Sequence, residues 1–220
     1  MSRTSPDGVA RTAVVVADAA AAAAAPPGVD GREYALAMAE DVLELVGDLS
    51  IVDPALLCVP RDDPAWTADV AVRSWPGTPV GEYRGQASGE AVLAAVELAS
   101  AQAADAAVVV TGDAPDLPGL LLGKLLRALG SAEIACCTTG SGALVALATR
   151  LPVPVWLTPG LASFDTADAL ARLRAAAPDG SVVAEGPGWH RLREPADVRR
   201  LDPGLEGWDA TRALLSARPT

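Results

Sequence analysis

The sequence predicts an α/β fold of three layers (α-β-α), in which helices cover both faces of a mostly parallel central sheet. Short apolar runs rich in β-branched residues alternate along the chain with segments whose apolar residues recur at helical spacing. The runs are apolar throughout, as expected of strands buried on both faces. A length of 220 residues suits one α/β domain. We therefore expect a disordered polar N-terminus over 1–11 and a single domain over 12–220.

The first elements follow from a strand, a loop and a helix cap. The run TAVVVA predicts a strand over 12–17, and the alanine-rich segment 18–29 predicts a long loop closed by two prolines and a glycine. Because this loop lacks large side chains, we expect it to be mobile. Asp30 followed by Glu33 has the spacing of a capping box, so a helix should begin there. Its apolar residues fall on one face: Leu36, Ala39, Leu43 and Val46.

Two more strands, a helix and a central strand complete the first half. The segments ALLCVP (55–60) and VAVRSW (70–75) predict the second and third strands. Ser88 can cap a helix that runs to about residue 103. The run AAVVVT predicts the next strand over 106–111.

The second half repeats the alternation. Asp116 can cap a helix from Leu117 to about Leu129, with a proline tolerated in its first turn. Two apolar runs then predict strands over 132–138 and 143–149, joined by a turn with two glycines. The remaining expected elements are a helix at 165–177, which Asp165 would start, a strand at 181–186, and short helices at 195–201 and 208–217.

Composition excludes several classes of function. The net charge of −11 and the pI near 4.5 argue against nucleic-acid and anionic-membrane partners, which need clustered basic residues. Three cysteines without a CxxC motif, together with one histidine, suggest no zinc site and fit a reducing cytoplasm. The apolar, alanine-rich start faintly resembles a signal peptide, but Asp7 and Asp18 interrupt that pattern. No stretch is long enough to span a membrane.

Asp113 is the strongest candidate for a functional residue. It comes just after the expected strand 106–111, within VVVTGDAPDLPG, at the carboxyl end where ligands of such sheets bind. One or two carboxylates are enough to hold Mg²⁺ when substrate phosphates and water complete the shell. Alternatively, Asp113 is a turn residue that bonds its own backbone. No catalytic residue can be named: a lone histidine such as His190 is more often structural, and Trp189 and Trp208 suit packing better than base stacking.

The stretch 84–148 resembles a known family. Its parts are RGQASGEAVLAAVELA, then VVVTGDAPDLPGLLLGKLLRAL, then the turn and strand GSGALVAL. This order is similar to small bacterial transferases of the glycosyltransferase-A fold, akin to 2-phospho-lactate guanylyltransferase and molybdenum-cofactor guanylyltransferase. The resemblance covers about residues 12 to 200. It implies a nucleotidyl- or glycosyl-transferase-like protein with a nucleotide or nucleotide-sugar donor and Mg²⁺ or Mn²⁺ on Asp113.

The resemblance also assigns binding positions. Gly28 and Arg32 match the phosphate-handling loop, and Gly89 lies where a helix N-terminus could face an anion. For Gly89, a turn glycine before a capped helix is an equally good interpretation. Gly140 and Ser141 lie in the turn that corresponds to a Gly-rich turn of the family, and they are the candidate substrate-binding residues.

The sequence departs from the family pattern in three places. Arg32 is the only basic residue left after Pro27-Gly28, and the turn 139–142 has neither an acid nor an aromatic residue. The segment 191–195 (RLREP) carries arginine where the family has an acid near the metal. The alternative hypothesis is therefore a non-catalytic nucleotide-binding or regulatory relative that has lost the phosphate-handling residues.

Overall fold

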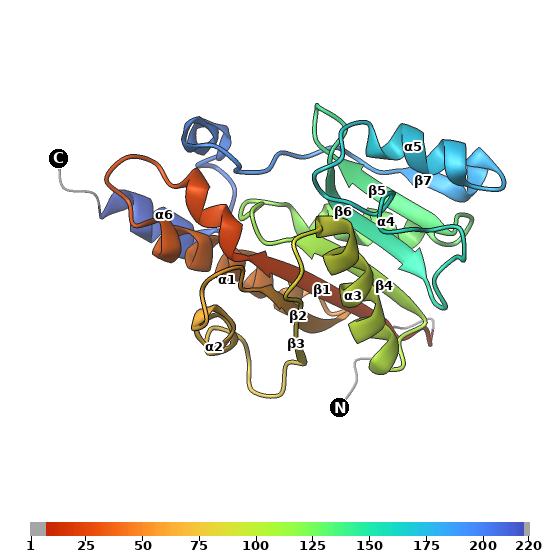
Figure 1. Cartoon of the computed structure of the whole chain (residues 1–220), viewed down its shortest axis with the longest axis horizontal. Helices are drawn as coiled ribbons and strands as arrows, with labels where there is room; N and C mark the ends of the chain where they lie inside the picture. The colour runs from red at the N-terminus through yellow and green to blue at the C-terminus, as the bar shows by residue number, and fades with distance from the viewer. Residues whose placement is uncertain (1–7, 218–220) are drawn as a thin grey trace.

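The structure is a computed structural model that describes residues 8–217 (Figure 1). Over this range seven strands form one sheet in the order β3-β2-β1-β4-β6-β5-β7. All neighbouring strands are parallel except β6, which is antiparallel to both β4 and β5. The strands are β1 Arg11–Asp18, β2 Asp53–Val59, β3 Val80–Glu82, β4 Ala106–Thr111, β5 Ile134–Thr138, β6 Leu144–Arg150 and β7 Val183–Glu185. The predicted mostly parallel sheet is confirmed.

Helices cover both faces of the sheet, as the three-layer prediction requires. One face packs against α1 (Gly31–Asp48), α2 (Trp66–Ala71) and α4 (Gly119–Ala128). The other face packs against α3 (Ser88–Ala101) and α5 (Ala169–Ala176). The last helix, α6 (Asp209–Ser216), lies beside α1 (Figure 1). Three 3-10 helices complete the described elements: η1 Ala19–Ala24, η2 Gly180–Val182 and η3 Pro195–Arg200.

The central strand β1 shows why the apolar runs become buried strands. Alternate side chains of a strand point to opposite faces of the sheet. Ala13, Val15 and Ala17 pack into the core under α1, whereas Val14 and Val16 pack into the core under α3. All five are buried, so a polar residue at any of these positions would lose its hydration.

The predicted strand at 70–75 is wrong. Residues 66–71 form α2 instead, and the edge strand β3 lies farther along the chain at Val80–Glu82. Trp66 fixes this helix against β1, because its ring is buried and its indole N–H donates to the carbonyl of Ala17 at 2.9 Å. The alternation of apolar residues in VAVRSW therefore reflects one buried side chain, Val70, on a short helix.

The segment 18–29, predicted to be a loop, forms the 3-10 helix η1 in its first part. The carboxylate of Asp18 accepts from the backbone N–H of Ala20 at 2.9 Å and starts η1, and Ala24 is buried at its end. The mobility of this segment stays a prediction. The cap of α1 is confirmed, because Asp30 accepts from the backbone N–H of Glu33 at 2.9 Å.

Two predicted caps are wrong. Helix α4 begins at Gly119 after an N-cap proline, and the cap of α3 is Ala87 instead of Ser88. Asp116 accepts instead from the indole N–H of Trp189 at 3.2 Å, and its carboxylate lies 3.0 Å from Nε2 of His190. These contacts bind the segment after β7 to the end of β4.

Boundaries elsewhere differ by a few residues. Helix α5 begins at Ala169, so Asp165 does not start it, and the strand expected at 181–186 is divided between η2 and β7. β1 already includes Arg11, which corrects the last residue of the expected disordered N-terminus. Residues 1–7 of that prediction lie outside the described residues. The packing role of Trp208 is confirmed: it is buried between α1 and the C-terminal segment.

Candidate functional site

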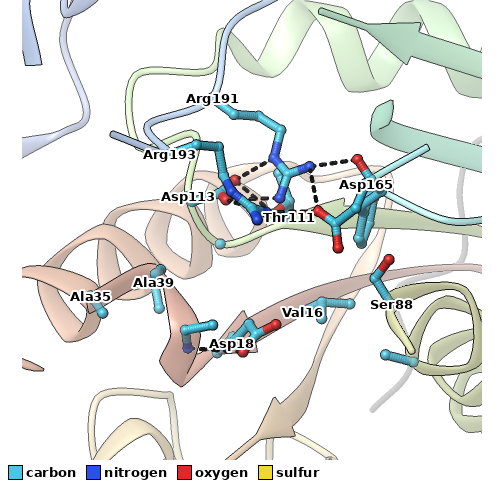
Figure 2. A pocket seen from close by; sticks show the side chains of 16 residues that line it. Val16, Asp18, Ala35, Ala39, Ser88, Thr111, Asp113, Asp165, Arg191 and Arg193 are labelled. Atoms are coloured by element: carbon cyan, nitrogen blue, oxygen red, sulfur yellow. Dashed lines mark hydrogen bonds and ion pairs between the residues drawn. The ribbon is translucent and has the colours of Figure 1, made fainter. Parts of the chain in front are cut away.

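A pocket lies beyond the carboxyl ends of β1 and β4 (Figure 2). β1 contributes Asp18 and β4 leads to Asp113. Arg191 and Arg193 reach in from the segment after β7, and Figure 2 shows both pointing toward Asp113, with Asp18 on the opposite wall. The other lining residues include Ala35 and Ala39 of α1, Ser88 and Ala91 of α3, and Phe164 and Asp165 of the segment before α5. The pocket therefore occupies the ligand-binding position of an open α/β sheet.

Asp113 forms a buried ion pair with Arg191. Nε and Nη2 of Arg191 donate to the two carboxylate oxygens, each at 2.8 Å, and the hydroxyl of Thr111 donates to Oδ1 at 2.8 Å. The side chains of Asp113 and Arg191 are only 5% and 6% exposed. A carboxylate that holds Mg²⁺ together with phosphates and water would have to be open to the crevice, whereas that of Asp113 is buried.

Backbone contacts of the last third of the chain place Arg191. The backbone N–H of Leu192 donates to the carbonyl of Asp113 at 2.8 Å, and that of Trp189 donates to Thr138 at 3.0 Å. Nη1 of Arg191 also donates to the carbonyl of Phe164 at 2.7 Å, and its guanidinium carbon lies 5.5 Å from the centre of the Phe164 ring. Arg191 thus joins the end of β4 to two segments that are distant in sequence.

The electrostatics keep both groups charged. Burial raises the pKa of Asp113, but the charge and hydrogen bonds of Arg191, with smaller contributions from Arg193 and Thr111, outweigh it. The net pKa of Asp113 therefore lies below its ordinary value. Burial lowers the pKa of Arg191, and the charge of Asp113 more than reverses that effect.

Arg193 is the more accessible cation of the pocket. Its Nη1 lies 2.8 Å from Oδ1 of Asp165 and 3.6 Å from Oδ2 of Asp113. The side chains of Arg193 and Asp165 are 49% and 47% exposed, so solvent reaches this pair freely. Its contact with Asp165 is therefore weak and easily exchanged.

A third arginine holds Asp18 on the opposite side of the pocket. Arg61, just after β2, donates through Nε and Nη2 to the carboxylate of Asp18 at 2.8 and 2.6 Å. Its Nη1 donates to the backbone and side-chain oxygens of Gln86 at 3.0 and 2.9 Å. Arg61 thus connects the ends of β1 and β2 with the segment that precedes α3.

The space around these groups is divided into two parts. The pocket itself has a volume of about 20 Å³, little more than the roughly 10–15 Å³ that one ordered water requires. Beside it, beyond the end of β2, lies a shallow groove of about 560 Å³ that is largely open to solvent. Ala20 belongs to both spaces, and Arg61 borders the groove. The groove is lined by Ala19, Ala20, Pro60, Arg61, Asp62, Asp63 and Gln86.

The residues around Asp113 do not fit a divalent metal ion. Oδ1 already accepts from Arg191 and Thr111, and Oδ2 accepts from Arg191. The remaining lone pair of Oδ2 faces a second cation, because Nη1 of Arg193 lies 3.6 Å from that oxygen. Two guanidinium groups also lie where the positive ion would have to approach. Within residues 8–217, no three acidic, histidine or cysteine side chains are grouped so that they could hold a metal.

Five residues were predicted to bind nucleotide or substrate, and all lie within residues 8–217. None of them lines the pocket: Gly28, Arg32, Gly89, Gly140 and Ser141. Arg32 is held elsewhere: Nε donates to Asp63 at 2.7 Å and Nη2 donates to Asp69. Gly28 has a φ of 83° and is a turn residue.

Gly89 is packed against the backbone of the segment between β6 and α5. A Cβ at this position would lie 1.8 Å from the carbonyl oxygen of Pro159. Gly140 and Ser141 lie in the exposed turn between β5 and β6, where the hydroxyl of Ser141 is 2.9 Å from that of Thr139. A nucleotide or substrate role for these residues stays a prediction.

The sequence interpretation missed Asp18 and Asp165, which line the pocket, and Arg61, which lines the groove. Asp18 and Arg61 each follow an apolar run that becomes a parallel strand, and that position is a usable signal for a crevice residue. Asp165 carried no such signal, because its contact with Arg193 depends on tertiary folding. Arg191 and Arg193 were visible only as a departure from the family pattern.

Comparison with known proteins supports the fold. The sequence matches no protein-family profile and no curated protein. A solved structure assigned as a nucleotide-diphospho-sugar transferase, from Desulfovibrio desulfuricans G20, has a TM-score of 0.66 and 19% identity, covering 98% of each chain. The 4-diphosphocytidyl-2C-methyl-D-erythritol synthase of Anaerococcus prevotii DSM 20548 has a TM-score of 0.58 and 15% identity, covering 88% of this chain and 97% of that one.

A third solved structure is that of CMP:2-keto-3-deoxy-manno-octonic acid synthetase in complex with CTP. It has a TM-score of 0.55 and 12% identity, and covers 94% of this chain and 98% of that one. The chain therefore has the nucleotide-diphospho-sugar transferase fold. Among the described residues, no helix is long and apolar enough to cross a membrane.

Proposed function

We propose that this protein is a nucleotidyl- or glycosyl-transferase-like protein that binds a nucleotide or nucleotide sugar beyond β1, β2 and β4. The observation that carries the proposal is the placement of Arg191 and Arg193 in the pocket and of Arg61 in the adjoining groove, in a chain with a net charge of −11. An acidic protein repels phosphate at long range, so it needs a local group of guanidiniums to hold one.

The open groove supplies the room that the pocket lacks. Its volume of about 560 Å³ suits a nucleoside. A nucleoside there would have Arg61 beside it, and its phosphates would extend toward Ser88 and Arg193. Ser88 also begins α3, whose free backbone N–H groups favour an anion. Structures of the same fold are assigned to nucleotide-dependent transferases, and one of them holds CTP.

The chemistry that this arrangement supports is positioning and charge neutralisation. Transfer of a phosphoryl-linked group requires the donor to be aligned with its acceptor and the developing negative charge to be stabilised. Arg61 and Arg193 are placed to do the second. The predicted likeness to guanylyltransferases, with their choice of base, stays a prediction.

A second candidate function is a non-catalytic nucleotide-binding or regulatory relative. It is favoured by one observation: Asp113, the predicted ligand of the catalytic metal, is sealed by Arg191. Both candidates expect a nucleotide in the groove. They differ in whether the bound donor is consumed.

A ligand screen followed by a turnover assay tests these proposals. We expect at least one nucleoside triphosphate or nucleotide sugar to raise the melting temperature, because a ligand that binds the native state stabilises it. The matching nucleoside without phosphates should raise it less. If no nucleotide changes the melting temperature, both candidates are excluded. Detection of released pyrophosphate or nucleoside diphosphate with candidate acceptors then supports the transferase over the binding protein.

A further inference from the structure

We propose that Arg191 takes the place of a divalent cation on Asp113 and that Arg193 binds the phosphate of the ligand, so that binding needs no metal. This inference rests on the proposed nucleotide site. It specifies how that site neutralises negative charge.

Arg191 has the properties of a built-in cation. Its planar guanidinium matches the carboxylate of Asp113 with two hydrogen bonds of 2.8 Å. It is also fixed from behind by the carbonyl of Phe164. A metal ion would have to displace this group, leaving a buried guanidinium without its partner.

Arg193 adds to the barrier against a metal. Its Nη1 is 3.6 Å from Oδ2 of Asp113, so an ion on that oxygen would meet a second positive group within a few ångströms. A divalent cation beside two guanidiniums is strongly disfavoured by like-charge repulsion. The same two arginines make the position favourable for an anion.

The carboxylate of Asp165 marks where that anion would bind. It lies 2.8 Å from Nη1 of Arg193 and 3.7 Å from Nη1 of Arg191, and half of its side chain is exposed. Because half of this side chain is exposed, its carboxylate can rotate away from Arg193 without moving the backbone. A phosphate could then take over its contact with Arg193, gaining more charge-assisted hydrogen bonds than a carboxylate offers.

The test is calorimetric titration of the full chain with CTP, GTP, UTP and ATP, each in EDTA and each in excess Mg²⁺. We expect at least one triphosphate to bind with a Kd that differs by less than threefold between the two conditions. Arg193→Gln should weaken that binding at least tenfold. Arg193→Lys keeps the charge but cannot donate two parallel hydrogen bonds, so it should weaken binding by less than Arg193→Gln.

The matched control is Arg200→Gln. Arg200 is 58% exposed and pairs with one aspartate, Asp197 at 3.2 Å, but does not line the pocket. Its substitution should change the Kd less than twofold. Melting temperatures of all variants establish that each is folded.

The outcomes separate the two levels of the proposal. Binding that falls tenfold or more in EDTA, or an Arg193→Gln variant no weaker than Arg200→Gln, overturns the inference and leaves the nucleotide site intact. Absence of binding in every condition overturns the nucleotide site, and this inference with it.

Discussion

Replacing Asp113 by asparagine should destabilise the protein strongly. The substitution keeps the size of the side chain but removes the charge that balances Arg191. An amide can accept at one atom only, so its NH₂ group would face one of the two guanidinium N–H donors that now bind the carboxylate.

The magnitude follows from burial. The side chains of the pair are 5% and 6% exposed, so the remaining guanidinium cannot regain water without opening the structure. Removing one partner of such a buried pair costs about 3–5 kcal/mol of the free energy of unfolding. A metal ligand exposed to solvent would lose less than about 1 kcal/mol. A buried ion pair and an exposed metal ligand at Asp113 therefore predict losses of the free energy of unfolding that differ several-fold.

Urea unfolding at pH 7 measures this difference, with Asp165→Asn as the control. Asp165 also pairs with an arginine but is half exposed, so its substitution should cost less than about 1 kcal/mol. In the double variant Asp113→Asn with Arg191→Met, the loss should be smaller than the sum of the single losses, because the double variant leaves no charged partner behind. A loss below about 1 kcal/mol for Asp113→Asn alone would refute the buried pair.

The pH dependence provides a second test of the same pair. The folded-state pKa of Asp113 is below the ordinary value of about 3.9. Its contribution to stability is therefore present above that value and is lost as the pH falls through the folded pKa. The difference in free energy of unfolding between the wild type and Asp113→Asn should thus shrink below about pH 4. A difference that stays constant down to pH 3 would contradict the pKa shift.

Two further predictions concern titration and packing away from the pocket. Burial raises the pKa of Asp41, which accepts from the backbone N–H of Thr211, to about 6. The contribution of protonated Asp41 to the free energy of unfolding is present below about pH 4 and is lost as the pH rises through 6. The stability of the wild type relative to Asp41→Asn should therefore fall by at most about 3 kcal/mol from pH 4 to 7. Denaturant unfolding at several pH values measures this change. Gly89→Ala should cost about 1–3 kcal/mol, because its Cβ would lie 1.8 Å from the Pro159 carbonyl. Gly123→Ala in α4, where the added Cβ would meet no atom within 4 Å, should instead stabilise by about 0.5–1 kcal/mol, and equal effects of the two would contradict the packing at Gly89.

The buried strands could be predicted because their composition alone determines their environment. A run such as 106–111, apolar in all but its last position, has no wet face and must lie inside a covered sheet. The segment 70–75 could not be assigned in this way, because its conformation depends on Trp66, which reaches across to β1. In this segment a tertiary contact, and not the local pattern of apolar residues, determines the secondary structure.

The sequence predicted where the site lies, but not which residues surround Asp113. The position of Asp113 at a strand end follows from the order of strand and turn, and the structure places it there. Its partner could not be predicted, because Arg191 lies 78 residues farther along the chain and meets it only after β7 folds beside β5. The role of Arg193 could not be predicted either, since nothing in RLREP indicates that one arginine is buried and the other half exposed.

A crystal of the protein grown with Mn²⁺ and the best-binding nucleoside triphosphate tests the central claim most directly, through the anomalous signal of the metal. We expect Arg191 to remain on Asp113, a phosphate to contact Arg193, and any manganese to lie on the phosphates away from Asp113. An anomalous peak within about 2.5 Å of a carboxylate oxygen of Asp113, with Arg191 displaced, would contradict the account.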